Sequence, residues 1–253
     1  QGIAFLLIPI YANYLAPGEY AILTIAMTLN AALVVVLQFG LAGALTRLHF
    51  DYLGNERERR ALYGTTWLFV TGSALLLTLL LDWQGEGLFR LLFRSIPFLP
   101  YGRLALWQAF VTVASVTPLV LFRVREQPVP YTALNVSRFL LSSGLIVFFV
   151  VFRHEGAAGA LKGQLLAGAA MAVPFTYIAL RSMRLAFHWD KLRASLAFGL
   201  PLVPHQLSGW ALQMSDRPVM ERFLPLDQVG IYSMGYRIGQ ILDLILNSAN
   251  MAW

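Results

Sequence analysis

The sequence predicts an all-α polytopic membrane protein: a six-helix bundle followed by the first two helices of a second, parallel-repeat bundle. Composition, the spacing of apolar runs and an internal repeat predict this fold. Of the 253 residues, 58% are hydrophobic and only 13% are charged, and the mean hydropathy is +0.63. Soluble domains carry about 25% charged residues. The composition therefore excludes an ordinary soluble domain.

Eight segments contain roughly the 20 apolar residues that a helix needs to cross about 30 Å of hydrocarbon. They lie near 1–15, 20–45, 62–81, 103–122, 131–152, 159–180, 196–224 and 229–253. The loops after the second, fourth and sixth segments carry ten Lys and Arg residues, whereas the other side carries at most seven. The positive-inside rule places the first set of loops in the cytoplasm. Since both ends of the sequence lie in apolar runs, we expect the chain to be a fragment.

The repeat relates residues 9–22 to residues 218–231, at an offset of 209 positions. The aligned pairs are Pro9 with Pro218, Tyr14 with Phe223, Leu15 with Leu224, and Ile22 with Ile231. An offset of six spans is even, so both copies enter the bilayer in the same direction, as parallel repeats do. The repeat therefore predicts a first bundle over 1–195 and the start of a second bundle over 196–253.

Charge and cysteine content exclude several classes of function. The net charge is +6, but the basic residues are scattered between apolar runs and form no stripe for nucleic acid. There is no cysteine, which excludes disulfides and thiolate chemistry. The loops contain no Asp-x-Asp motif and no histidine cluster. We therefore expect no catalytic residues, no metal and no cofactor, which argues against a glycosyltransferase or a glycan polymerase.

Polar residues inside the last two segments are the main functional signal, because each costs free energy in lipid. In 229–253 they fall within a helical sector of about 140°: Ser233, Tyr236, Arg237, Gln240, Asp243, Asn247 and Asn250. In 196–224 they share a sector of about 120°: His205, Gln206, Gln213, Asp216 and Arg217. These faces predict an aqueous pocket. The alternatives are a static polar seam between helices and a surface ion pair of Asp216 with Arg217.

Prolines, the lower polarity of the first copy and two further arginines also bear on the predicted function. Pro201 and Pro204 free backbone groups at the start of 196–224, which predicts a bend suited to a gate. The first copy is much less polar at the positions that correspond to the face of the last segment, so we expect functional polarity mainly on the second copy. Arg47, at the inner end of the second segment, is either functional or a loop anchor, and Arg138 is expected to snorkel to the cytoplasmic headgroups.

The sequence also resembles a known family, the oligosaccharide flippases of the multidrug, oligosaccharidyl-lipid and polysaccharide exporter superfamily. The resemblance covers essentially the whole chain and is carried by short motifs: Pro9 with Tyr14-Leu-Ala-Pro-Gly-Glu-Tyr-Ala21, Phe39-Gly-Leu-Ala-Gly-Ala-Leu-Thr-Arg47, Phe198-Gly-Leu-Pro-Leu-Val-Pro-His205, Ser215-Asp-Arg217 and Val229-Gly-Ile-Tyr-Ser233. It implies two six-helix bundles around a central cleft in the inner (plasma) membrane. It also implies movement of a polyprenyl-diphosphate-linked oligosaccharide to the outer leaflet, with membrane lipids, glycan polymerase and glycosyltransferases as partners. Only eight of an expected twelve to fourteen spans are present.

That substrate suggests roles for the candidate residues. Arg47 and Arg237 would hold the diphosphate, because fixed cations bind anions, and amides would meet the sugar hydroxyls: Gln213, Gln240, Asn247 and Asn250. Candidates for ion or proton coupling are Asp243, Asp216, His205 and Arg217. A lipid-linked peptidoglycan precursor flippase stays open as an alternative. A multidrug cation antiporter is disfavoured by Arg237, and a purely structural scaffold leaves the polar face of 229–253 without a reason.

Overall fold

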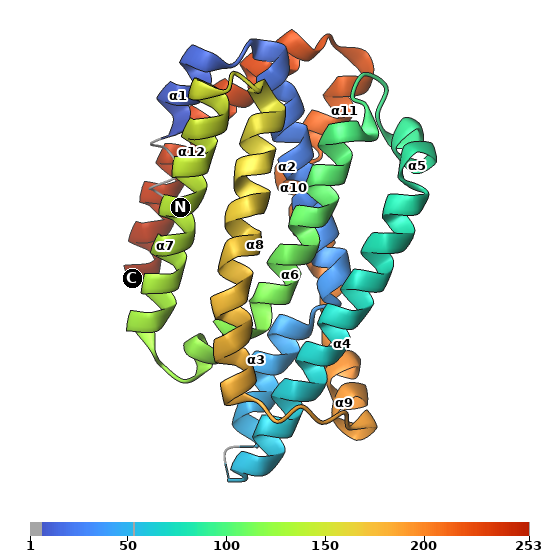
Figure 1. The fold of residues 1–253 in the computed structure, drawn as a ribbon, viewed down its shortest axis with the longest axis vertical. Coiled ribbons are helices and arrows are strands. Elements are labelled where there is room, and N and C mark those ends of the chain that lie inside the picture. The colour runs from blue at the N-terminus through green and yellow to red at the C-terminus, as the bar shows by residue number, and fades with distance from the viewer. Residues whose placement is uncertain (1–6, 53, 253) are drawn as a thin grey trace.

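The structure, a computed structural model, describes residues 7–52 and 54–252; for Ser182 and residues 241–252 it describes the backbone alone. Within these ranges every regular element is a helix, and the longest helices lie side by side along the long axis of the molecule (Figure 1). The α-helices before residue 150 are α1 (Ile8–Tyr14), α2 (Pro17–Gln38), α3 (Leu41–Asp51), α4 (Glu56–Trp83), α5 (Gly85–Leu92), α6 (Arg103–Val124) and α7 (Pro128–Val147). They are followed by α8 (Gly156–Ser182), α9 (Trp189–Gly199), α10 (Leu202–Met214), α11 (Asp216–Phe223) and α12 (Leu226–Ala252), with π-helical turns η2 (Phe98–Gly102) and η3 (Phe148–Phe152). The all-α prediction is confirmed.

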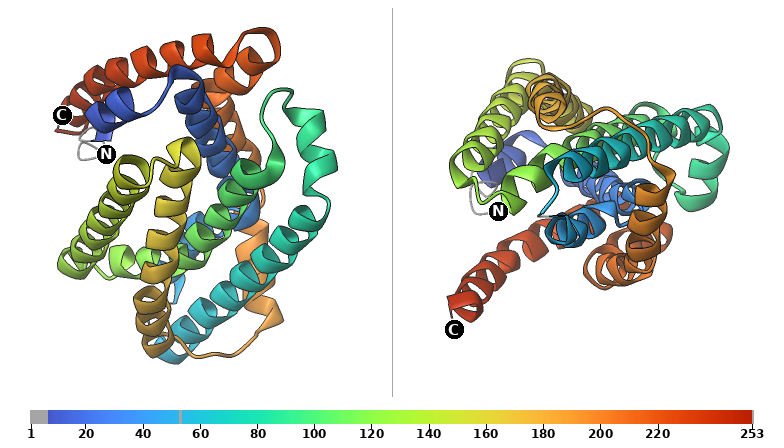
Figure 2. Two further views of the ribbon diagram at one scale, coloured as in Figure 1. Left: turned by 45° about the horizontal axis from the view of Figure 1, so that its top comes forward. Right: turned by 90° about the horizontal axis from the view of Figure 1, so that it is seen from below.

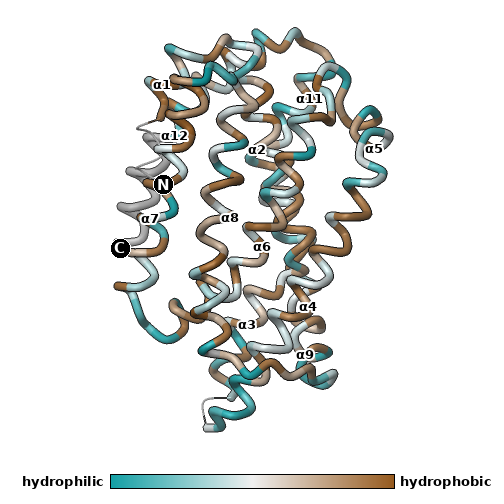
Figure 3. Tube along the Cα trace, in the orientation of Figure 1, coloured by the Kyte–Doolittle hydropathy of each residue, from teal (hydrophilic) through white to brown (hydrophobic). Residues whose placement is uncertain are grey.

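Five helical segments are long and apolar enough to cross a membrane: Pro17–Gln38, Glu56–Trp83, Phe98–Val124, Pro128–Phe152 and Gly156–Arg181. Figure 3 shows apolar residues along these helices and hydrophilic residues gathered at their ends. The chain is therefore a membrane protein. We call the end that carries α3 and α9 the inner end, following the charge bias of the loops, and the end that carries α1, α5 and α11 the outer end.

The predicted span 20–45 is not one helix, because the chain breaks between α2 and α3. Phe39 and Gly40 adopt left-handed conformations, with φ of 52° and 66°. The left-handed region disfavours side chains other than glycine and ends a helix. A Cβ atom on Gly40 would lie 2.1 Å from the carbonyl oxygen of Gly199, so this break lets the backbones of α3 and α9 meet.

The predicted span 196–224 is also interrupted, in this case twice. Helix α9 ends at Gly199, α10 begins after Pro201, and α11 begins at Asp216 with Pro218 in its first turn. Proline has no N–H for the bond to the preceding turn, so each helix restarts around its proline. The bend predicted at Pro201 is present, while the second interruption at Ser215 was not predicted.

The repeat is visible in the backbone. Helix α1 ends at Tyr14 and α2 begins at Pro17, whereas α11 ends at Phe223 and α12 begins at Leu226, again 209 residues later. The intervening Leu15 and Leu224 are both extended, with φ/ψ of −109°/132° and −122°/151°. Their N–H groups cap the preceding helices in the same way, since Leu15 donates to Tyr11 at 3.0 Å and Leu224 donates to Met220 at 2.8 Å.

The second copy is tied to the first bundle at the inner end. Helix α9 packs against α3 and α4. The ammonium of Lys191, whose side chain is buried, pairs with Glu58 and lies 4.6 Å from the ring centroid of Tyr52. Thr65 donates to the carbonyl of Ala186 at 2.9 Å. These contacts fix where α9 begins and so position α10 along α2.

Candidate functional site

The two copies meet at the outer end, where α12 packs along α2. The hydroxyl of Thr24 donates to the hydroxyl of Ser233 at 3.3 Å, and both residues are buried. Nearby, a Cβ atom on Gly230 would lie 1.8 Å from the carbonyl oxygen of Pro17, so only glycine fits there. Toward its C-terminal end α12 moves away from the other helices, as the right view of Figure 2 shows. The copies are therefore joined near their outer turns.

Arg237 lies on α12 one turn beyond this crossing and faces the first bundle. Its guanidinium carbon is 5.9 Å from the ring centroid of Tyr11 on α1, which favours a cation–π contact. Tyr11 is buried and also interacts with Gln164 of α8, whose amide oxygen accepts a 2.8 Å hydrogen bond from Gln108 of α6. Among the side chains that the structure describes, no acidic group pairs with Arg237. This predicted site residue thus lies at the junction of both copies.

A second group of site residues connects α10, α11 and α12. The guanidinium of Arg217 is 3.4 Å from a carboxylate oxygen of Asp216 and 4.5 Å from the ring centroid of Tyr236. The phenol of Tyr232 donates to the other carboxylate oxygen of Asp216 at 2.5 Å, and the phenol of Tyr236 donates to the carbonyl of Gln213 at 3.5 Å. Asp216 and Arg217 therefore pair with each other, but Arg217 is buried rather than part of a surface ion pair.

The structure does not bring all candidate residues to one place. Arg47 is exposed on α3 at the inner end, with Asp51 at 3.9 Å as its partner, far along the molecule from the α2–α12 crossing (Figure 1). His205 and Gln213 have exposed side chains on α10, and Gln240 is partly buried on α12. The side chains of Asp243, Asn247 and Asn250 lie outside the described residues. Pro201 precedes α10 and Pro204 lies in its first turn.

Several polar residues of the first bundle were not predicted as site residues. Gln108 and Gln164 pair across α6 and α8. The guanidinium of Arg138 donates to the hydroxyl of Thr112 at 3.3 Å, near the middle of both α7 and α6. The expectation that Arg138 snorkels to the inner headgroups was therefore wrong, because its guanidinium is held by a neighbouring helix. Each of these residues interrupts an apolar run, which is the same sequence signal that marks the polar residues of the last two segments.

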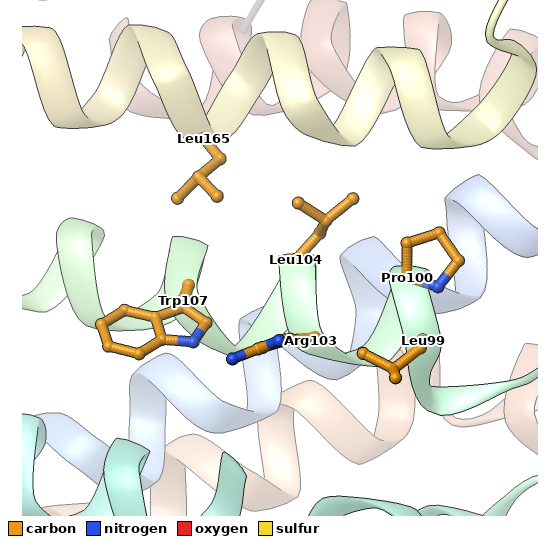
Figure 4. A pocket seen from close by; sticks show the side chains of 6 residues that line it. All are labelled: Leu99, Pro100, Arg103, Leu104, Trp107 and Leu165. Atoms are coloured by element: carbon orange, nitrogen blue, oxygen red, sulfur yellow. The ribbon is translucent and has the colours of Figure 1, made fainter.

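A cavity of about 580 Å³ lies between α6 and α8 near the outer end (Figure 4). Its lining is mostly apolar and consists of Leu99, Pro100, Arg103, Leu104, Trp107 and Leu165. The guanidinium of Arg103 is paired with Asp82 of α4 at 3.0 Å. This cavity contains none of the predicted site residues. Within the described part of the chain, no group of three His, Asp or Glu side chains gathers as a metal site requires.

A family model described as "Polysaccharide biosynthesis protein" matches residues 1–253. No curated protein and no solved structure matches the chain significantly. The family match covers the same residues as the sequence resemblance and is consistent with it.

Proposed function

Because this match spans the whole chain, the chain belongs to the polysaccharide biosynthesis protein family, and we propose that it moves a lipid-linked oligosaccharide across the plasma membrane. The proposed substrate is a polyprenyl-diphosphate-linked oligosaccharide, carried from the cytoplasmic to the outer leaflet for surface polysaccharide synthesis. The protein is then a transporter and not an enzyme. Membrane lipids and the machinery for glycan polymerisation and glycosyl transfer are its proposed partners.

The observation that carries this proposal is the position of Arg237. Residues 229–253 are predicted to cross the membrane, and an arginine within such a segment is costly and marks a polar pathway. Arg237 lies beside the aromatic ring of Tyr11, at the junction of both copies, and its proposed role is to bind an anion. A diphosphate is such an anion, because guanidinium groups bind phosphate oxygens through paired hydrogen bonds.

The amides on both sides of Arg237 support recognition of the sugars. Gln164 and Gln108 extend the polar line from Tyr11 into the first bundle. On the second copy, the proposed sugar-binding residues are Gln213, Gln240, Asn247 and Asn250. Amides and hydroxyls replace the water that a sugar loses on leaving solution, which removes most of the cost of its transfer.

Alternating access is the proposed mechanism, with the two bundles rocking about their junction. The break at Pro201 supplies a bending point between α9 and α10, and Pro204 in the first turn of α10 is the second proposed gating residue. Arg47 would contact the diphosphate at the inner end, at another stage than Arg237. Asp216, Asp243, His205 and Arg217 are the proposed groups for ion or proton coupling.

The test is the replacement of Arg237 by Ala and by Lys in the full-length protein. Arg237→Ala should abolish surface glycan export, with lipid-linked intermediates accumulating on the cytoplasmic side, while Arg237→Lys should retain part of it. Arg153→Ala, which removes an exposed arginine beside Glu155, is the matched control. Normal export by Arg237→Ala would remove the assigned role. A cell-wall defect with intact surface glycan would instead favour the peptidoglycan precursor flippase.

A further inference from the structure

A set of directional contacts joins α11 of the second copy to the first bundle at the outer end. The carboxylate of Glu221 accepts the backbone N–H of Arg94 at 2.9 Å and 3.2 Å through its two oxygens, and it also accepts the N–H of Ser95. The next residue, Arg222, donates to the carbonyl of Leu91 at 2.7 Å. Segment 91–95 consists of the last two residues of α5 and the three residues after it, and it belongs to the connection between the third and fourth predicted spans.

Glu221 is an unusual carboxylate because only 2% of it is exposed. A buried carboxylate requires hydrogen-bond donors, and here the backbone of segment 91–95 provides them. If that segment moved away while Glu221 stayed in place, a charge would be left without partners in an apolar environment. Glu221 and segment 91–95 therefore stay together.

The apolar cluster that contains Phe93 of segment 91–95 also mixes residues of the two copies. Phe89, Phe93 and Ile96 from α5 and its following loop pack in one buried cluster with Ala21 of α2 and Val229 of α12. This cluster lies directly at the outer end, next to the crossing of α2 and α12 (Figure 1). Any opening of the outer end between the copies must part this cluster and the Glu221 contacts together.

The first copy has no acidic residue at this place. At the corresponding positions 209 residues earlier it has Ala12 and Asn13, and the amide of Asn13 donates to the carbonyl of Pro9 in its own helix at 2.9 Å. If the repeated turn itself required an acidic residue, both copies would carry one at this position. The acidic residue is thus specific to the junction with segment 91–95.

We propose that Glu221 and Arg222 form an outer latch, which holds the outer end closed by binding segment 91–95 and must release it before the outer side can open. This inference rests on the proposed transport function, because a closed outer end matters only if the two sides open in turn. The α2–α12 crossing supplies close backbone packing, and the latch supplies the directional, charge-assisted bonds that lock it.

Residues 1–253 contain no cysteine, so a single introduced cysteine can report access once any cysteine elsewhere in the full-length protein is replaced by serine. Ser233→Cys is nearly isosteric and places a thiol at the buried crossing. In the full-length protein, a membrane-impermeant maleimide added from outside should label it slowly. Adding Glu221→Ala should raise the labelling rate on the order of tenfold or more. Glu221→Gln, which keeps the shape but loses the charge, should give a smaller increase.

Glu86→Gln is the control, because Glu86 is an exposed acidic residue on α5 whose partner, Arg90, lies 3.8 Å away on the same helix. It should leave labelling unchanged. If Glu221→Ala does not insert stably, Arg222→Ala decides, since this exposed residue contributes only the bond to Leu91. Unchanged labelling in every inserted latch variant would overturn the proposal and leave Glu221 as a static tie. Labelling needs no substrate, so its result is independent of the glycan-export test of Arg237.

Discussion

The hydroxyl oxygens of Thr24 and Ser233 lie 3.3 Å apart, and the two residues are separated by 209 positions, the offset of the internal repeat. In a two-fold arrangement a residue touches its own counterpart only at the symmetry axis. Gly18 and Asp227 are also counterparts, and a Cβ atom on Gly18 would lie 2.8 Å from the Asp227 carboxylate. The two contacts mark a local two-fold axis between α2 and α12, where small side chains are required.

Replacing Gly230 by Ala should therefore destabilise the protein. The new Cβ atom would lie 1.8 Å from the carbonyl oxygen of Pro17, a distance that forces the helices apart. Overpacking of this kind costs roughly 1–3 kcal/mol. Gly235→Ala is the control, because no atom lies within 4 Å of its Cβ position and alanine favours a helix by up to about 1 kcal/mol. Thermal unfolding in detergent measures the stability of both variants. If Gly230→Ala were as stable as Gly235→Ala, the close crossing of α2 and α12 would be contradicted.

Tyr232→Phe should weaken the attachment of α11 to α12. It removes the hydroxyl that donates to Asp216 at 2.5 Å but keeps the aromatic ring beside Tyr236. Because Tyr232 is partly solvated, we expect a loss of about 1 kcal/mol, the usual net contribution of one hydrogen bond. Tyr14→Phe, at an exposed tyrosine, should be neutral. Unfolding temperatures compare the two variants, and an equal effect would show that the bond to Asp216 contributes nothing.

Arg138→Met should be tolerated or even stabilising. The arginine lies in a membrane-spanning helix, and within the described residues its guanidinium donates to the neutral hydroxyl of Thr112, so its charge is poorly compensated. Replacing poorly compensated buried charge by apolar groups of similar size is often neutral or stabilising by about 1–4 kcal/mol. Export should be measured alongside stability. Stable protein with lost export would assign Arg138 to the transport pathway, whereas a large loss of stability would contradict the expectation.

Glu155 should make the stability of the α7–α8 connection depend on pH. A hydrogen bond from Lys162 and the positive charges of Lys162 and Arg153 hold the pKa of this carboxyl below its usual range. A carboxyl with a lowered folded pKa stabilises the fold above its unfolded pKa, and the contribution is lost as the pH falls through the folded value.

The measurement is the stability difference between the wild-type protein and Glu155→Gln, followed from about pH 7 to about pH 3. The wild-type protein should be more stable near neutral pH, and the difference should shrink as the carboxyl is protonated. In a Lys162→Met background the same replacement should have a smaller effect. A difference that stays constant over this range would show that the ion pair with Lys162 does not stabilise the connection.

The sequence predicted the uninterrupted helices well. The apolar runs 62–81, 103–122 and 159–180 lie inside α4, α6 and α8, because length and hydropathy alone determine whether a helix crosses lipid. The interruptions were harder to predict. The left-handed residues Phe39 and Gly40 adopt their conformations where Gly199 approaches, and that contact joins parts of the chain that no local pattern connects.

The sequence likewise predicted only part of the candidate site, because no local pattern reveals contacts between distant parts of the chain. Arg237, Asp216 and Arg217 were predicted as site residues because a charge inside an apolar run is visible in the sequence. Their partners were not, because Tyr11 and Tyr232 are ordinary aromatic residues until the fold places them beside a guanidinium or a carboxylate. Glu221 was missed because it follows a proline near the outer turn, where acidic residues are usually solvated.

The contact between Gly40 and Gly199 has a mechanical consequence. Two interrupted helices cross at their interruptions, backbone against backbone, and below this point α3 and α9 pack together. Because the two backbones touch there, a change of angle at the α2–α3 break would displace the α9–α10 break as well. A methyl group on Gly40 would meet the carbonyl oxygen of Gly199 at 2.1 Å, so this coupling requires glycine at position 40.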